Sequence, residues 1–460
     1  MNHAETLLTL LQRGPRTAAE MARALALSQP TIARALQRVA PRIVRMGRAR
    51  ATRYALLRAL SPETPPQAYP IWRVSERGAP QQIGTLSPIQ PAGYWYEDAR
   101  HPQASRFHED LPWFLQGLRP QGFLGRIVAR QLSQNGYPAD LRIWTADHVL
   151  RALTDAATHD HIGNCIVGQR AIDQYRHDQR LALAPGVPQA LSLRLAHYGR
   201  AAENLLNDGL PGSSAGGDQP KFLASVHDPQ DDSRRAVIVK FSPPLDTEAG
   251  QRWGDLLRME SLALATLREA LNLPAATATW MTDGHRAYLE VDRFDRTDAH
   301  GRRDVVSLSI LDAEFVGHGD GWPRVVEALV AQQLLHPDAL TGARILTAFS
   351  ELIGNNDRHL GNLSVIDTPG PTAHLAPAYD ILPMLYAPGH HGLRHSAMDE
   401  THRAQAERAL HALPDEWAPR VTEAARAFWN RCAADSHIGD AMRAISAQNA
   451  QWVPARSRPH

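Results

Sequence analysis

The sequence contains little cysteine, little lysine and no long apolar run. Its 460 residues include only two cysteines, which exclude a disulfide scaffold and a cysteine-based zinc site and favour a reducing cytoplasm. No apolar stretch approaches the ~18 residues of a membrane span, and residues 1–16 lack the basic start of a signal peptide. We therefore expect a cytoplasmic protein with no membrane partner.

Lysine is nearly absent although basic residues are plentiful. Of the 49 basic residues, only Lys221 and Lys240 are lysines, and the other 47 are arginines. A compact ammonium and a planar guanidinium fit different geometries, so the two side chains are not interchangeable at a phosphate. Because the chain otherwise uses arginine, we expect these two lysines to be candidates for phosphate binding.

The formal net charge of +1 conceals an uneven distribution. Residues 1–60 carry eleven arginines and two acids, a net of +9, which leaves a net of −8 for the remainder. At about 150 residues per domain, the length predicts two or three domains. The basic first segment indicates a module that binds nucleic acid.

The pattern of residues 1–60 predicts a helix-turn-helix. A first helix stops at Gly14, and Thr17 caps a second helix. Ser28 then caps a third helix over residues 30–39, with a proline near its first turn.

A β-hairpin wing is expected next, with strands at residues 43–46 and 52–56. The third helix and the arginine-rich tip of the wing would contact double-stranded DNA, since their side chains are those that reach base edges and phosphates. The expected DNA-binding residues are Gln29, Thr31, Arg34, Arg38, Arg48 and Arg50. The alternative is a winged helix that makes protein contacts only.

The remaining domain boundaries follow from composition. Residues 61–70 hold four prolines and predict a stiff, exposed linker. We expect an N-terminal subdomain of the body at 71–200, a core with a helical C-terminal lobe at 201–440, and a tail at 441–460.

A glycine-rich stretch precedes Lys221. Part of it, residues 212–216, matches the G-x-S-x-G elbow of serine hydrolases, but that motif needs a helix directly after the serine, and Gly217 and Pro220 would break one. We favour a flexible loop whose backbone N–H groups approach phosphates, followed by a strand from Lys221.

Four further features stand in the order found in protein kinases. Lys240 ends a strand, and Glu260 follows in a helical segment, 254–271, which predicts an ion pair that holds ATP. Asp357 and Asn362 have the D-x-x-x-x-N spacing of a catalytic loop, and Asp380 stands in the place of a magnesium-binding aspartate. The strand before them, residues 288–294, would meet adenine.

These motifs together resemble the HipA-like serine/threonine kinases, the toxins of bacterial persistence toxin–antitoxin systems. The similar segments are Ser213–Lys221, Val239–Phe241, Asp292–Arg296, Ile353–Asn362 and Tyr379–Asp380. The likeness runs from about residue 71 to about residue 430. The basic N-terminal segment resembles the HipH/YjjJ-like branch, in which a helix-turn-helix is fused to the kinase body.

The resemblance implies an α+β fold, a kinase-like two-lobed HipA body with an N-terminal winged helix-turn-helix. It implies ATP and Mg²⁺ as cofactors and Asp357 as the catalytic base, with Asn362 and Asp380 holding the metal. The implied ATP-binding residues are Ala215, Gly216, Gly217, Asp218, Gln219, Lys221, Lys240, Glu260, Asp292, Arg293, Phe294, His359, Asn362, Tyr379 and Asp380. It also suggests autophosphorylation on Ser213 or Ser214.

Two departures from the family pattern bear on loop geometry. The glycine-rich loop is one residue longer than in the best-known HipA pattern, and an Asn-Asn pair precedes Asp357.

The resulting hypothesis is a toxin kinase that phosphorylates serine or threonine of a protein and binds DNA through its first 60 residues. An antitoxin and a second copy of the chain are candidate partners. Two alternatives are a transcriptional regulator whose degenerate kinase body senses nucleotide, and a toxin that acts on DNA.

Overall fold

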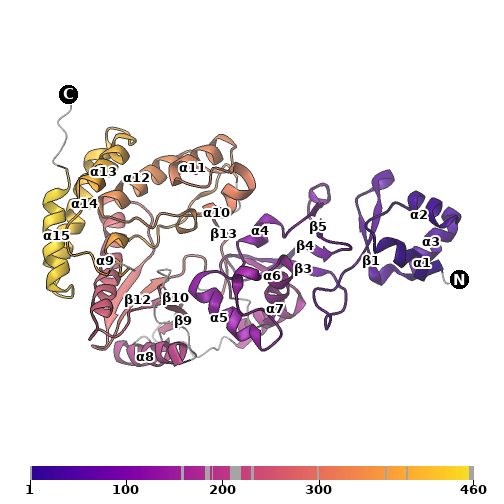
Figure 1. The fold of residues 1–460 in the computed structure, drawn as a ribbon, viewed down its shortest axis with the longest axis horizontal. Coiled ribbons are helices and arrows are strands. Elements are labelled where there is room, and N and C mark those ends of the chain that lie inside the picture. The colour runs from indigo at the N-terminus through magenta and orange to yellow at the C-terminus, as the bar shows by residue number, and fades with distance from the viewer. Residues whose placement is uncertain are drawn as a thin grey trace. The chain divides into compact units, whose positions relative to one another are not determined.

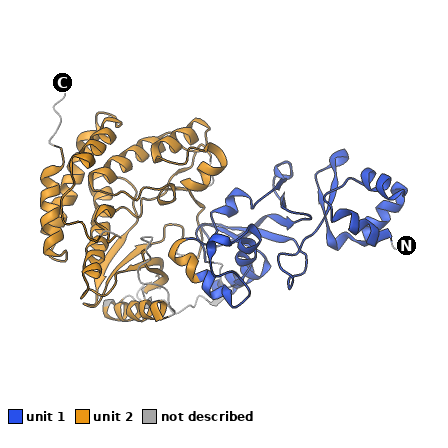
Figure 2. Cartoon of the chain, viewed as in Figure 1, with its two compact units in different colours: residues 1–121, 128–183 blue, residues 122–127, 184–460 orange. Residues whose placement is uncertain are grey.

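The computed structural model describes most of the chain. The described residues are 3–156, 160–181, 187–188, 190–207, 219–228, 233–297, 300–367, 370–389 and 392–454. The chain divides into two compact units, one of residues 1–121 and 128–183 and the other of residues 122–127 and 184–460 (Figure 2).

Three short helices and a hairpin open the first unit (Figure 1). They are α1 (His3–Leu11), α2 (Ala18–Leu25), α3 (Gln29–Arg38), β1 (Ile43–Met46) and β2 (Arg53–Leu56). Thr17 and Glu20 form a capping box before α2, with the Glu20 N–H donating to Thr17 Oγ1 at 3.2 Å and the Thr17 N–H donating to Glu20 Oε2 at 2.7 Å. The Ser28 hydroxyl accepts from the Thr31 N–H at 3.3 Å and begins α3.

The hairpin is buried on both faces, because side chains alternate along its strands. One face packs into the core of the three helices through Ile43, Tyr54 and Leu56. The other face, Val44, Met46 and Ala55, packs against Ile89 and Trp95 of the sheet that follows. The hairpin therefore joins the N-terminal helices to the rest of the first unit.

A partly buried ion pair reinforces this join. The Arg58 guanidinium binds the carboxylate of Asp147, with Nη2 at 3.0 Å from Oδ1, and the Tyr94 hydroxyl donates to the same carboxylate. Burial disfavours the charge on Arg58, but Asp147 outweighs it and raises the pKa of Arg58.

The expected linker over residues 61–70 is shorter than predicted. Residues 62 and 63 and residues 65–68 are exposed, but Tyr69 and Pro70 already belong to β3 (Tyr69–Val74). Tyr69 is 5% exposed and packs in the core of the sheet, so the burial of one aromatic ring extends the strand into the proline-rich stretch.

The larger sheet of the first unit has the order β6-β5-β4-β3-β7, with every pair antiparallel. Its other strands are β4 (Pro80–Pro88), β5 (Tyr94–Asp98), β6 (Arg106–His108) and β7 (Cys165–Val167). The helices are α4 (Trp113–Gln116), α5 (Gly122–Ser133), which crosses both units, α6 (Ala146–Leu153) and α7 (Gln169–Leu181). Val149 and Leu150 of α6 pack into the same core as Tyr69 and Leu86 of the sheet.

A second sheet, in the order β11-β12-β10-β9-β8, forms one half of the second unit. Its strands are β8 (Val187–Pro188), β9 (Lys221–Asp228), β10 (Ser233–Phe241), β11 (Ala278–Thr282) and β12 (Ala287–Asp292). Tyr198 of α8 (Leu191–Asn207) packs with Phe222 and Val239 on one face. The long helix α9 (Glu248–Leu271) begins six residues before the predicted 254, because Thr247 caps it.

The other half of the second unit is mainly helical. A small sheet, β13 (Val305–Ser307), β14 (Ser364–Ile366) and β15 (His374–Leu375), accompanies α10 (Leu308–Leu311), α11 (Trp322–Ala331), α12 (Asp338–Leu352), α13 (Glu400–His411), α14 (Trp417–Ala434) and α15 (Asp440–Trp452). Phe349 of α12 packs against Phe428 of α14, with ring centroids 6.2 Å apart. No helix in the described ranges is long and apolar enough to span a bilayer.

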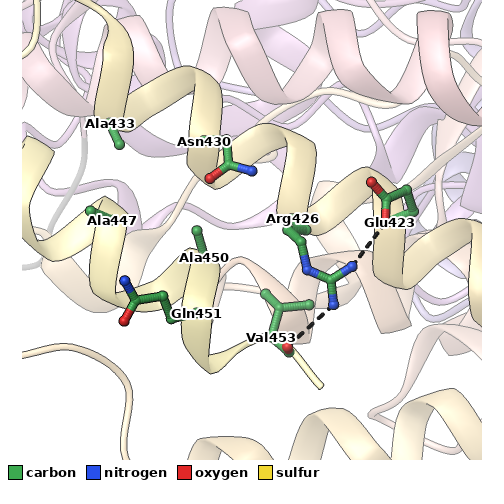
Figure 3. Close-up of a pocket in the computed structure, with 8 residues that line it drawn as sticks. All are labelled: Glu423, Arg426, Asn430, Ala433, Ala447, Ala450, Gln451 and Val453. Atoms are coloured by element: carbon green, nitrogen blue, oxygen red, sulfur yellow. Dashed lines mark hydrogen bonds and ion pairs between the residues drawn. The ribbon is translucent and has the colours of Figure 1, made fainter. Parts of the chain in front are cut away.

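The tail expected at 441–460 is helical over most of its length. Helix α15 buries Met442, Ile445 and Trp452, whose spacing places them on one face against α14. A cavity of about 710 Å³ lies between these helices. Figure 3 shows residues that line it, among them Ala433, Ala447 and Ala450.

Candidate active site

The only two lysines of the chain meet on the second unit's large sheet. Lys221 begins β9 and lies directly opposite Lys240 of β10 in the antiparallel register. Directly opposed residues project to the same face, so both ammonium groups belong to the face away from the core that contains Val239 and Phe222.

Lys240 binds two carboxylates. Its Nζ donates to both oxygens of Glu260 on α9, at 2.7 and 2.8 Å, and also to Asp380. Burial opposes the charge on Lys240, but Asp380 and Glu260 together raise its pKa above the ordinary value. The predicted ion pair between Lys240 and Glu260 is thus present, and Asp380 joins it.

Asp380 has a strained backbone and a depressed pKa. Its φ of 54° lies in the left-handed region, which costs energy for a residue other than glycine. Burial raises the pKa of its carboxyl group, but nearby Lys240, Lys221 and His359 outweigh burial and lower it to about 2. Asp380 is therefore an anion held within a group of cationic side chains.

Tyr379 ties Asp380 to the loop that carries Asp357. Its hydroxyl donates to the Gly361 carbonyl at 2.8 Å and lies 2.7 Å from the hydroxyl of Ser364. Its ring packs against Phe294, with centroids 5.8 Å apart. Tyr379 and Phe294 are both among the expected nucleotide residues, and the structure brings their rings together.

The loop from Asp357 to Asn362 is closed by two amide side chains. The Asn362 Nδ2 donates to the Asp357 carbonyl at 2.8 Å, and Asn355 Oδ1 accepts from the Asp357 N–H at 3.2 Å. Asn355 is 1% exposed, whereas the Asp357 side chain is 49% exposed. Sequence reasoning missed Asn355, although the Asn-Asn pair before Asp357 was the signal that could have found it.

His359 faces the carboxylate of Asp357. Its Nδ1 accepts from the Gly361 N–H at 3.0 Å, which places the proton of a neutral ring on Nε2. Nε2 lies 4.0 Å from Asp357 Oδ1. A Cβ atom on Gly361 would lie 2.9 Å from the His359 ring, so a glycine at 361 permits this close approach.

The side chains at the end of β12 are engaged by the protein itself. Asp292 binds Arg235 of the neighbouring strand, and burial raises the pKa of Asp292. Arg293 binds Asp295 at 3.0 Å. Asp292, Arg293 and Phe294 end the strand expected to meet adenine, and the Phe294 ring packs against another site residue, Tyr379.

Glu290 on β12 is a buried residue that sequence reasoning missed. It is 1% exposed and accepts from the Tyr198 hydroxyl at 2.7 Å, from Arg194 at 3.2 Å and from Arg235 at 2.8 Å. Tyr198 and Arg194 belong to α8, the last described element before the glycine-rich stretch, so Glu290 fixes that helix on the sheet.

The expected phosphate loop lies mostly outside the described residues. Ser213, Ser214, Ala215, Gly216, Gly217 and Asp218 are not described. Gln219 is described, and its Nε2 donates at 2.6 Å to the carbonyl of Phe241, the residue after Lys240. Its buried Oε1 has no hydrogen-bond partner among the described residues. The last part of the stretch is therefore anchored beside Lys240.

The chemistry of these residues fits Mg²⁺ and a polyphosphate. Asn362 and Asp380 offer oxygen ligands, and magnesium binds to one or two such groups while water and substrate phosphates complete its coordination. Lys221 and Lys240 supply positive charge beside them. Within the described ranges, no group of three or more His, Cys, Asp or Glu side chains could hold a metal ion. Magnesium at this site would therefore also need water and phosphate oxygens as ligands.

The N-terminal segment has a separate polar surface. Gln29, Arg34 and Arg38 of α3 and Arg48 and Arg50 of the hairpin turn are exposed, as predicted. Thr31 is half-buried, because its hydroxyl lies 2.8 Å from that of Ser28 at the helix cap.

A groove of about 690 Å³ runs between α3 and the hairpin, lined in part by Gln29, Ala33, Gln37, Arg45 and Tyr54. Sequence reasoning missed Gln37 and Arg45 in this surface. The four-residue spacing from Gln29 through Ala33 to Gln37 is the signal that could have found the first of them.

A curated relative settles the family. The toxin YjjJ of Escherichia coli K12 is 36% identical over 453 residues, which cover 98% of this chain and 97% of that protein. The chain belongs to the YjjJ-like toxins. Family models agree, since the YjjJ-like toxin middle domain matches residues 66–176 and the HipA-like C-terminal domain matches residues 213–451.

One solved structure supports a HipA-like fold for this YjjJ-like toxin. A chain of the Shewanella oneidensis HipA–HipB–operator DNA complex matches with a TM-score of 0.51 and 16% identity, covering 83% of this chain and 95% of that one. The Helicobacter pylori proinflammatory kinase CtkA matches with a TM-score of only 0.33 and 13% identity, covering 51% of this chain and 90% of that one. The predicted family is confirmed, and the body of the YjjJ-like toxin has a HipA-like fold.

Proposed function

We propose that this YjjJ-like toxin is an ATP- and Mg²⁺-dependent protein kinase that phosphorylates serine or threonine. The observation that carries the proposal is the bond network of Lys240, on β10, with Glu260 and Asp380. A strand lysine paired with a helix glutamate is the arrangement with which kinases orient the phosphates of ATP.

Each residue has a distinct task in this proposal. Lys240 and Lys221 bind phosphate oxygens, while Asn362 and Asp380 hold magnesium, which neutralises charge on the phosphates when bound. Asp357 accepts the proton of the acceptor hydroxyl. The oxygen of that hydroxyl bonds to the γ-phosphorus, and the bond between this phosphorus and ADP breaks. Its half-exposed side chain is open to an acceptor from solution.

Asp357→Asn tests the enzymatic part. Phosphoryl transfer from labelled ATP should fall by about 10²- to 10⁴-fold, because the base is lost, while ATP binding stays close to wild type. Full transfer by the variant would refute the role of Asp357. ATP binding without transfer by the wild-type protein would favour a nucleotide-sensing regulator instead.

The family resemblance also suggests autophosphorylation at Ser213 or Ser214. A phosphate there adds about −1.5 to −2 charges in the stretch proposed to bind the phosphates of ATP and would repel them. Phosphopeptides from residues 200–221 are expected after incubation with Mg-ATP. An active preparation without them would contradict this step.

We further propose that α3 and the hairpin bind duplex DNA. Support comes from the exposed arginines and from the adjoining groove that contains Arg45 and Gln37. About six phosphate contacts would give a slope of about −5 for log affinity against log salt. Replacing Arg34, Arg48 and Arg50 by alanine should flatten that slope, whereas Arg142→Ala, at an 89% exposed side chain, should not. Salt-independent binding would exclude the proposal.

A further inference from the structure

The loop that carries Asp357 is held from one side by the segment 305–322. Strand β13 pairs with β14, and the Leu308 N–H donates at 2.8 Å to the carbonyl of Leu363, just after the loop. The chain then passes through α10 and a π-helix (Asp312–Val316). This segment therefore lies against the end of the loop.

The segment is also fixed where it turns toward α11. Residues 317–321 are exposed, and buried Asp312 accepts from the N–H groups of His318 and Gly319 at 2.9 and 2.8 Å. Gly321, with φ of 73°, immediately precedes α11. Because glycine has no side chain, α11 begins without a side-chain cap. The first residue of α11, Trp322, thus follows a turn with a defined backbone.

Trp322 makes the second contact with the loop. It is 2% exposed, and its indole Nε1–H donates to the carbonyl of His359 at 3.0 Å. The same carbonyl accepts the N–H of Asn362 at 3.0 Å. Both lone pairs of the His359 carbonyl are therefore used, one within the loop and one by a residue outside it.

Packing holds this loop through Leu360, which is 8% exposed, but leaves its reactive side chains outside the core. The side chains of Asp357 and His359 are 49% and 61% exposed. Their positions depend on backbone hydrogen bonds, and the bond from Trp322 acts on the peptide between Asp357 and Asn362. A buried donor outside the loop thus fixes the segment that separates the proposed base from a proposed magnesium ligand.

We propose that Trp322 is a positioning residue for phosphoryl transfer. Its indole N–H holds the His359 peptide and so keeps Asp357 at the correct distance from the bound nucleotide. Trp322 touches none of the reacting atoms. The inference rests on the proposed kinase function and adds to it a residue outside all of the sequence motifs.

The test compares two tryptophan-to-phenylalanine variants. Trp322→Phe keeps most of the ring volume and removes the N–H. Trp429→Phe is the control, because Trp429 is 0% exposed and its indole donates at 3.0 Å to the carbonyl of Leu352, the last residue of α12. Both variants lose one buried hydrogen bond in the same unit.

Only Trp322→Phe should impair catalysis. Its kcat should fall by about tenfold, with the KM for ATP within about twofold of wild type, because small displacements of a catalytic group lower the rate without weakening nucleotide binding. Trp429→Phe should keep the wild-type kcat. Equal losses in the two variants, or no loss in Trp322→Phe, would overturn the proposal.

Amide hydrogen exchange gives a readout that needs no activity. Exchange at Gly361 and Asn362 should be faster in Trp322→Phe than in wild type and unchanged in Trp429→Phe. Unchanged exchange in Trp322→Phe would also overturn the proposal. If the wild-type protein transfers no phosphate, the kinase function fails, while exchange still decides whether Trp322 holds the loop.

Discussion

Lys221 and Lys240 lie directly opposite each other on the antiparallel strands β9 and β10. Like charges in such positions destabilise a sheet unless anions compensate them. Glu260 and Asp380 bind Lys240, and both lysines lower the pKa of Asp380. The sheet therefore holds a concentrated group of charges whose cations suit phosphate oxygens.

Lys240→Arg should impair ATP binding and turnover. A guanidinium is larger and planar, so it cannot place one compact charge between Glu260 and Asp380 at 2.7 to 2.8 Å from the Glu260 oxygens. We expect a loss of at least about tenfold in ATP affinity, corresponding to ~1.4 kcal/mol.

The affinity can be measured by calorimetry with an ATP analogue, and thermal unfolding checks that the variant is folded. Arg258→Lys, at the ion pair of Arg258 with Asp435, is a matched control that should leave ATP affinity near wild type, because neither residue is among the proposed ATP contacts. Normal affinity and turnover in Lys240→Arg would remove the argument drawn from the two lysines.

Asp255 should make stability depend on pH. Its carboxylate accepts the Gly439 N–H at 2.8 Å, and burial raises its pKa to about 6. Because the folded state binds this proton more tightly than the unfolded state, the contribution of Asp255 to stability falls as pH rises from about 4 to about 6. The rise in the pKa of Asp255 from its ordinary value to about 6 corresponds to a loss of roughly 3 kcal/mol of unfolding free energy across this pH range.

Asp255→Asn isolates that contribution. The amide keeps an acceptor oxygen and carries no charge, so the stability of the variant relative to wild type should rise across this pH range and level off above it. Urea unfolding between pH 4 and 7 measures the difference. Asp435→Asn is the control, and its stability relative to wild type should change with pH in the opposite direction. The pKa of Asp435 is lowered, because the hydrogen bond from the His437 N–H and the contact with Arg258 outweigh burial. A pH-independent difference for Asp255→Asn would contradict the prediction.

Arg58→Met should loosen the N-terminal helices and hairpin from the first unit's larger sheet. The substitution leaves the partly buried Asp147 carboxylate without its cation and should cost about 1–2 kcal/mol of unfolding free energy. Limited proteolysis should then cleave faster between residues 57 and 68.

Arg142→Met is the matched control for this join. Arg142 pairs with Asp140, but its side chain is 89% exposed, and exposed pairs contribute little to stability. The same proteolysis rate in both variants would show that the contact between Arg58 and Asp147 does not hold the hairpin in place.

Much of the local structure could be predicted from the sequence, because its determinants lie within a few residues. Thr17 and Glu20 form their capping box across one helical turn, and Ser28 caps α3. Two stretches were predicted as a linker, residues 61–70, and as a tail, residues 441–460. Tyr69 starts a strand and Trp452 ends a helix, since burial against distant residues decides their structure.

The amino-acid sequence by itself determined the order of the site residues and the scarcity of lysine. Tertiary structure alone placed Asp380 on Lys240, 140 residues away, and the Trp322 indole on the His359 carbonyl. It also buried the hairpin on both faces and joined Arg58 to Asp147. The physical reason is that caps and alternation act between near neighbours in the chain, whereas these contacts depend on how separate elements pack.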